Sequence, residues 1–207
     1  MLTMTEERVR LNWPNRVTLT RIVLIPAFLI AALQVQRAPT ANWSTVMRWL
    51  AFGIFFLMSA GDALDGLLAR RRNLQTELGR LLDPAADKML MISAYVLLAS
   101  RRWVQPIPDW VTVVVVSRDV FIALGFVFIR LVTGGFPLRV SWLGKVCTTS
   151  QMVTVLAVLS GDAVVGLEGR LMLFGLTVVL TVLSGVDYMF QARYLLSNQG
   201  PASPRVS

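Results

Sequence analysis

The chain of 207 residues has no histidine and a single cysteine, Cys147. One cysteine cannot form a disulfide within the chain, which excludes a disulfide-stapled fold. Zinc sites are built mostly from cysteine and histidine, so the same scarcity argues against zinc. Cys147 stands in an apolar stretch, and we expect it to be a structural thiol with no further role.

Charged residues are also scarce, because Asp, Glu, Lys and Arg make up 15% of the chain and hydrophobic residues 55%. The mean hydropathy is +0.63. Such a composition favours a protein whose helices lie in a bilayer. The net charge of +8 then points to cytoplasmic loops and anionic headgroups. Basic and aromatic residues do not alternate on any soluble module, so we expect no nucleic-acid partner.

Six apolar segments are each close to the ~20 residues that a helix needs to cross a bilayer. We therefore predict an all-α, polytopic membrane protein with six transmembrane helices, at residues 15–35, 47–69, 82–100, 110–131, 143–159 and 170–194. They would form one domain, residues 15–195. A polar, proline-containing tail, residues 196–207, is predicted to be disordered.

The N-terminal segment, residues 1–14, does not have a signal peptide's pattern, because two glutamates precede the first apolar run. We expect the first helix to be retained. The segment before it could be a short interfacial helix with Trp13 at the headgroups, or a frayed terminus.

Basic residues set the orientation of a membrane protein. The larger set lies on the side of the N-terminus: Arg8, Arg10, Arg16, Arg70, Arg71, Arg72, Arg80, Arg139, Lys145 and Arg193. We place this side in the cytoplasm, with both termini. The pair Arg101 and Arg102 falls on the other side and argues against this orientation.

Four aspartates stand close together beside one predicted loop. Asp62 and Asp65 are three apart near the end of the second helix, and Asp83 and Asp87 are four apart at the start of the third. These spacings put each pair on one helical face. A short connection makes the two helices antiparallel neighbours, so we expect both pairs to meet near the cytoplasmic edge of the membrane.

Four carboxylates in such a place need compensation, because each buried charge costs several kcal/mol. Protons could neutralise some of them, and so could divalent cations. Oxygen-only ligands suit magnesium, manganese or calcium. Two such ions bridged by carboxylates serve phosphoryl displacement in many enzymes. The alternative is a set of solvated charges, since acids favour helix N-termini and Asp83 and Asp87 are predicted at one.

Small and basic residues accompany the aspartates. Gly66 and Ala69 follow one turn after Asp62 and Asp65, where they leave room for a ligand against the backbone. Arg70 could bind phosphate oxygens as a bidentate fork. Gly79 is expected to relax the turn before Asp83.

The stretch "DALDGLLARRRNLQTELGRLLDPAAD" has the form D-x-x-D-G-x-x-A-R, eight residues, G-x-x-x-D-x-x-x-D. It resembles the signature of the CDP-alcohol phosphotransferase family at every fixed position. "WPNRVTLTRIVLIP" looks like the family's first helix, and "VSWLGKVCTTSQM" like the region before the fifth helix of its phosphatidylglycerophosphate synthases. Gly61 departs from the pattern, because those synthases often carry a polar residue there.

The resemblance implies a six-helix homodimer in the bacterial inner (plasma) membrane, with its active site facing the cytoplasm. Such enzymes move a phosphatidyl group from CDP-diacylglycerol to an alcohol and release CMP. By position, Asp62, Asp65, Asp83 and Asp87 would hold two Mg²⁺ or Mn²⁺ ions, and Asp87 would also be the general base. The nucleotide and diphosphate would lie against four further positions: Gly66, Ala69, Arg70 and Gly79.

The acceptor alcohol is less defined by the sequence. An acceptor such as glycerol 3-phosphate needs basic side chains for its phosphate, and the candidates are Arg118, Lys145, Arg139 and Arg21. Arg118 lies in an apolar segment, so it must be paired, and an ion pair with Asp119 or a snorkelling side chain would also satisfy it.

"WLGKVCTTSQM" favours glycerol 3-phosphate as the acceptor, whereas "SRDV" looks closer to the family's cardiolipin synthases, whose acceptor is phosphatidylglycerol. We prefer glycerol 3-phosphate. A cation-coupled transporter also uses intramembrane acids, but its sites lie near the bilayer midplane. The four aspartates flank a basic loop instead, which favours an enzyme.

Overall fold

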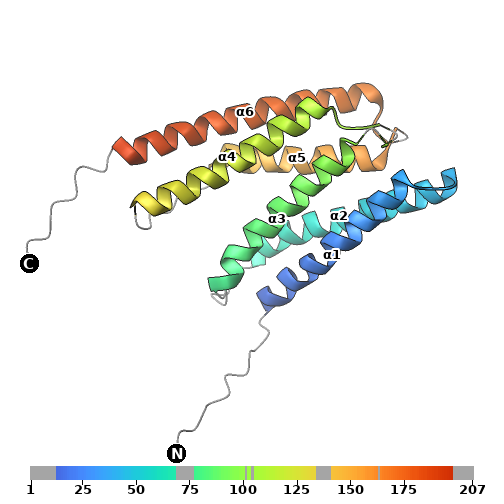
Figure 1. Cartoon of the computed structure of the whole chain (residues 1–207), viewed down its shortest axis with the longest axis horizontal. Helices are drawn as coiled ribbons and strands as arrows, with labels where there is room; N and C mark the ends of the chain where they lie inside the picture. Colours follow the sequence, from blue (N-terminus) through green and yellow to red (C-terminus); the bar gives the residue numbers. More distant parts are fainter. Residues whose placement is uncertain are drawn as a thin grey trace, which may run out of the picture. The chain divides into compact units, whose positions relative to one another are not determined.

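The computed structural model describes residues 13–68, 77–100, 102–103, 105–133, 141–162 and 164–197. Over these residues the chain is all helical, with six helices and no strand (Figure 1). The helices are α1 (Trp13–Gln36), α2 (Ala41–Leu68), α3 (Glu77–Leu98), α4 (Asp109–Thr133), α5 (Trp142–Ser160) and α6 (Leu167–Ser197). The predicted all-α class and the six helices are thus confirmed. Most of the predicted segment 1–14, and the tail beyond Ser197, lie outside the described residues.

Two helices begin earlier than predicted. The helix α2 starts at Ala41 rather than near residue 47, and α3 starts at Glu77 rather than near residue 82. At the start of α2, the Oγ1 atom of Thr40 accepts a hydrogen bond of 3.3 Å from the backbone N–H of Trp43. This is an N-cap, which stabilises a helix by satisfying one of its first N–H groups. Hydropathy could not predict either start, because both first turns are polar.

The chain forms two compact units, residues 1–93 and 94–207. In the first unit, α1 and α2 pack against each other and run in opposite directions (Figure 1). The rings of Phe28 and Phe55 lie 5.5 Å apart between centroids, and both side chains are fully buried. The helix α1 continues through Pro26. Aromatic packing of this kind holds the helix pair that leads to the first two aspartates.

In the second unit, α6 packs against both α5 and α4. The contact between α5 and α6 is lined by polar side chains at spacings of three and four, which we call the polar seam. It consists of Cys147, Ser150, Gln151 and Thr154 from α5 with Thr177 and Thr181 from α6. The hydroxyl of Thr177 lies 2.8 Å from that of Ser150 and 2.7 Å from that of Thr154. The hydroxyl of Tyr95, on α3, donates to the carbonyl of Gln151 at 3.3 Å. Hydrogen bonds between helices of this kind are typical of membrane proteins.

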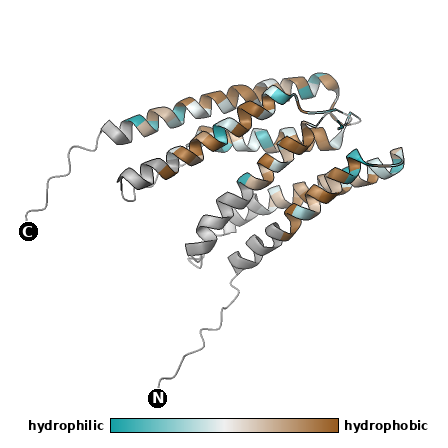
Figure 2. Ribbon diagram, viewed as in Figure 1, coloured by the Kyte–Doolittle hydropathy of each residue, from teal (hydrophilic) through white to brown (hydrophobic). Residues whose placement is uncertain are grey.

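The surface of α6 is more apolar than the face it buries. Leu171, Met172, Leu176 and Met189 are more than half exposed, whereas Thr177 is fully buried. Figure 2 shows hydrophobic residues along most of the described length of α6. Among the described residues, three helices are long and apolar enough to cross a membrane, at Ala41–Gly61, Trp142–Ser160 and Leu167–Arg193. An apolar outside around a polar seam is the distribution expected of helices surrounded by lipid.

Candidate active site

Asp62 and Asp65 lie in the last turns of α2, which continues to Leu68. Their spacing of three residues is therefore a helical spacing, as predicted, and brings the two positions to one side of the helix. Gly66 lies in the same turn. The side chains of residues 62–87 are outside those that the structure describes.

Asp83 and Asp87 lie further inside a helix than predicted. The helix α3 begins at Glu77, six residues before Asp83, so neither aspartate is in the first turn. The favourable effect of a helix N-terminus on acids falls off within that turn. The helix dipole therefore does not account for this pair. Gly79, expected in a turn, lies in the first turn of α3 instead, so that prediction was wrong because the helix starts earlier.

Three predicted site residues, Ala69, Arg70 and Arg139, lie outside the described residues. Arg21 lies within α1, but its side chain is not described. At Gly61, the position that departs from the family pattern, an added Cβ atom would meet nothing within 4 Å. Packing within the described part of the molecule therefore does not require a glycine at position 61.

The described side chains contain no group of three or more His, Cys, Asp or Glu residues that could hold a metal ion. The candidate ligands are the four aspartates of the motif. Their carboxylates supply only oxygen atoms, which fits a hard divalent cation such as Mg²⁺ or Mn²⁺.

Arg118 of α4 contacts α6 at Ser184, about one turn beyond the seam residue Thr181. The Arg118 side chain is 9% exposed. Its Nη1 atom donates to the Oδ1 atom of Asp119 at 2.7 Å. Its Nη2 atom donates to the hydroxyl of Ser184 on α6. The ring of Tyr188, one turn further along α6, lies 5.9 Å from its guanidinium carbon. The ion pair considered in the sequence therefore forms, and two residues of α6 add to it.

The Nε atom of Arg118 is buried and has no hydrogen-bond partner in the described part of the chain. A buried donor without a partner costs roughly 1–3 kcal/mol, more when the group is charged. Such an atom is a candidate contact for a ligand that accepts hydrogen bonds, such as a phosphate.

Gly144, in the first turn of α5, lies against the same guanidinium. A Cβ atom added at Gly144 would be 3.6 Å from the Nη2 atom of Arg118 and 3.8 Å from both the Ser184 hydroxyl oxygen and the Cε2 atom of Tyr188. On the α6 side, a Cβ atom added at Gly185 would lie 3.9 Å from the Cγ atom of Arg118. Two glycines therefore leave the space that the long arginine side chain occupies.

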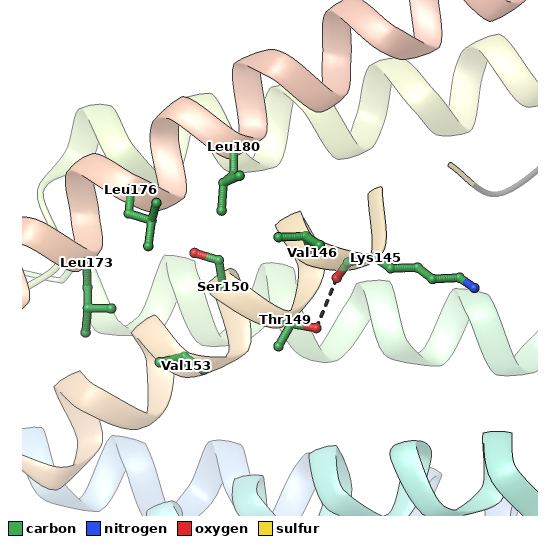
Figure 3. A pocket seen from close by; sticks show the side chains of 8 residues that line it. All are labelled: Lys145, Val146, Thr149, Ser150, Val153, Leu173, Leu176 and Leu180. Atoms are coloured by element: carbon green, nitrogen blue, oxygen red, sulfur yellow. Dashed lines mark hydrogen bonds between the residues drawn. The ribbon is translucent and has the colours of Figure 1, made fainter. Parts of the chain in front are cut away.

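Lys145 follows Gly144 but belongs to another surface. It lines an open groove of about 370 Å³ between α5 and α6, together with Val146, Thr149, Ser150, Val153, Leu173, Leu176 and Leu180. Figure 3 shows the Lys145 ammonium pointing away from the other side chains that line this groove. The groove itself is thus mainly aliphatic, and Lys145 is the one charged residue among the described residues that line it.

Ser184, Tyr188 and Gly144 were not among the residues predicted from the sequence. A signal for the first two was present, since Thr177, Thr181, Ser184 and Tyr188 recur at spacings of four, three and four on an otherwise apolar helix. Polar residues with this period mark the buried face of a spanning helix. Cys147 is buried and free, as expected of a structural thiol.

The model of one protein family, CDP-alcohol phosphatidyltransferase, matches residues 11–183. This chain belongs to that family. The family resemblance inferred from the aspartate motif is therefore confirmed.

Three similar proteins are each 34% identical to this chain. One is the CDP-diacylglycerol–glycerol-3-phosphate 3-phosphatidyltransferase of Bacillus subtilis (strain 168), over 86% of this chain and 93% of the relative. Another, with the same name, is from Escherichia coli (strain K12), over 92% of this chain and 100% of the relative. The third is a probable phosphatidylglycerophosphate synthase of Mycobacterium tuberculosis (strain ATCC 25618 / H37Rv), over 87% of this chain and 81% of the relative. Near-complete coverage of these relatives favours an enzyme over a transporter.

Proposed function

We propose that this protein transfers the phosphatidyl group of CDP-diacylglycerol to glycerol 3-phosphate, giving phosphatidylglycerophosphate and CMP. The observation that carries the proposal is the complete aspartate motif on α2 and α3 in a chain whose relatives bear the name of this reaction. Residues 15–195 would act as one catalytic domain. The motif supports the transfer chemistry, and the relatives' names support the acceptor.

Asp62, Asp65, Asp83 and Asp87 would hold two divalent cations, Mg²⁺ or Mn²⁺. When bound, such ions neutralise the charge of the donor's diphosphate and of the leaving CMP. Gly66, Ala69 and Gly79 would allow the nucleotide and diphosphate to approach the backbone closely, and Arg70 would bind phosphate oxygens.

The Asp87 carboxylate would accept the proton of the acceptor's hydroxyl. The hydroxyl oxygen then forms a bond with the phosphorus that carries the diacylglycerol group, and the bond from that phosphorus to the CMP oxygen breaks. General bases placed in this way contribute about 10²–10⁴-fold to a rate. Asp87 lies within α3.

Arg118 would bind the phosphate of glycerol 3-phosphate. Support comes from its buried guanidinium and its Nε atom, a donor that has no partner among the described residues. Arginine suits phosphate because its planar fork matches the geometry of the oxygens. Lys145, Arg139 and Arg21 remain candidates for the same anion.

The protein would be an integral membrane protein of the bacterial inner membrane. Six spans, with both termini and the active site on the cytoplasmic side, agree with the distribution of basic residues. The family resemblance further supports a homodimer. An active site at the cytoplasmic edge would join a lipid donor to a water-soluble acceptor.

The test is CMP release by the purified protein in detergent with CDP-diacylglycerol and glycerol 3-phosphate. We expect turnover with Mg²⁺ or Mn²⁺ and none in excess chelator, with recovery when the metal is restored. Full activity in excess chelator would contradict the metal-dependent mechanism. Phosphatidylglycerol, serine and inositol 1-phosphate are the comparison acceptors. CMP release with phosphatidylglycerol alone would identify a cardiolipin synthase instead.

A further inference from the structure

Arg118 is held by one group of its own helix and by two residues of α6. Asp119 already forms an ion pair with it at 2.7 Å, which compensates the charge. The α6 helix adds the Ser184 hydroxyl on the Nη2 atom and the Tyr188 ring over the guanidinium. Ser184 is itself fully buried, so its hydroxyl is withdrawn from other partners such as water.

These contacts fix the orientation of the guanidinium. Asp119 binds one terminal nitrogen and Ser184 the other, so the planar group cannot turn about its long axis without losing a hydrogen bond. The Nε–H group is the donor without a partner in the described part of the chain. An arginine constrained in this way loses less conformational entropy when it binds an anion.

We propose that Ser184 is a positioning residue for the acceptor: its hydroxyl holds Arg118 in the orientation that binds the phosphate of glycerol 3-phosphate. The inference rests on the proposed function, since it takes Arg118 as the phosphate-binding residue. A serine suits the task because it binds the guanidinium without adding a negative charge. Asp119 already places one carboxylate on the guanidinium, and a second one in the place of Ser184 would make the site net negative and repel the phosphate.

The proposed role of Ser184 differs from that of the hydroxyls in the polar seam. Thr177 and Thr154 bond to each other and to Ser150, all between neutral groups of α5 and α6. Ser184 instead bonds to a cation on a third helix, α4. A hydrogen bond to a charged group contributes more free energy than one between neutral groups, and its loss destabilises the charged partner.

The experiment compares Ser184→Ala with the wild type in steady-state kinetics. We expect the KM for glycerol 3-phosphate to rise about tenfold, the usual effect of losing one hydrogen bond to a charged group. The KM for CDP-diacylglycerol should stay unchanged. Ser160→Ala is the matched control, because Ser160 is also buried in a helix but donates only to the carbonyl of Ala157. Ser184→Thr, which keeps the hydroxyl, should recover much of the affinity.

A double variant separates positioning from general packing. Arg118→Ala alone should raise the KM for glycerol 3-phosphate strongly, and adding Ser184→Ala should change it by less than about twofold, because the serine acts through the arginine. Calorimetric titration of glycerol 3-phosphate into the protein gives the same comparison when turnover is too slow to measure.

Two different failures can be told apart. If Arg118→Ala leaves the affinity for glycerol 3-phosphate unchanged, the acceptor site of the proposed function is wrong, and the role of Ser184 falls with it. If Arg118→Ala weakens that affinity but Ser184→Ala does not, only the positioning role is wrong. Equal losses for both substrates in Ser184→Ala would show a packing defect and would also overturn the inference.

Discussion

The guanidinium carbon of Arg118 on α4 lies 5.9 Å from the centroid of the Tyr188 ring on α6. A cation over an aromatic face is attracted by the ring's quadrupole, an effect worth about 2 kcal/mol when the pair is shielded from water. Here the contact ties a charged residue of one apolar helix to another helix. Together with the ion pair to Asp119, it stabilises a buried guanidinium.

Asp87→Asn should lower turnover strongly while keeping some metal and donor binding. The amide keeps the shape of the side chain but cannot accept the proton of the acceptor's hydroxyl, so kcat should fall about 10²–10⁴-fold. Equilibrium binding of CDP-diacylglycerol to the variant checks that donor binding is kept. Asp109→Asn, at an exposed aspartate in the first turn of α4, is the matched control. Near-normal turnover in Asp87→Asn would remove the residue from the role of base.

Gly66→Leu should block the nucleotide by bulk while the protein still folds. We expect kcat/KM for CDP-diacylglycerol to fall about 10²-fold, the scale of a misplaced substrate. Gly53→Leu on the same helix is the control, since an added Cβ atom there meets nothing within 4 Å. An unchanged affinity for the donor in Gly66→Leu would refute a close approach of the ligand to the backbone.

At Gly144, the size of the substituted side chain should decide the outcome. Alanine fits, because its Cβ atom would lie at ordinary contact distances of 3.6–3.8 Å from its neighbours. Leucine would overfill the space at a cost of about 1–3 kcal/mol and displace Arg118. The KM for glycerol 3-phosphate should therefore rise in Gly144→Leu and stay near the wild-type value in Gly144→Ala. A wild-type KM in both variants would show that the Arg118 orientation does not matter for the acceptor.

Thr177→Val should weaken the fold and spare catalysis. The change keeps the shape of the side chain but removes its hydroxyl from Ser150 and Thr154 inside the polar seam. We expect a loss of about 1–2 kcal/mol. Thermal unfolding in detergent measures it, as a fall in Tm of about 2–4 °C per kcal/mol.

The control for the seam is Thr149→Val, at an exposed threonine of α5 whose hydroxyl bonds only to the carbonyl of Lys145. An equal Tm for the two variants would mean that the seam contributes no more stability than a surface hydroxyl.

Hydrophobic runs of about 20 residues predicted all six helices, of which three are long and apolar enough to cross a membrane over their described residues. They did not predict where α2 and α3 begin. Those turns are polar, and α2 is started by the Thr40 cap rather than by an apolar residue. Gly79 was misplaced in a turn for the same reason.

The aspartate motif was recognisable from the sequence because its residues are close in the chain and their spacing is helical. The surroundings of Arg118 were only partly predictable. Its pairing with Asp119 could be considered from the sequence because the two residues are adjacent in the chain. Its contacts with Ser184 and Tyr188 depend on how α4 packs against α6, which no local pattern determines.

The most direct measurement offers glycerol 3-phosphate and phosphatidylglycerol together to the purified protein, with CDP-diacylglycerol and Mg²⁺, and identifies the lipid product by mass spectrometry. A phosphatidyltransferase for glycerol 3-phosphate gives phosphatidylglycerophosphate, and the product should disappear when Asp62 and Asp65 are both replaced by asparagine. Cardiolipin as the product, with no phosphatidylglycerophosphate, would contradict the proposed acceptor and the phosphate-binding role of Arg118.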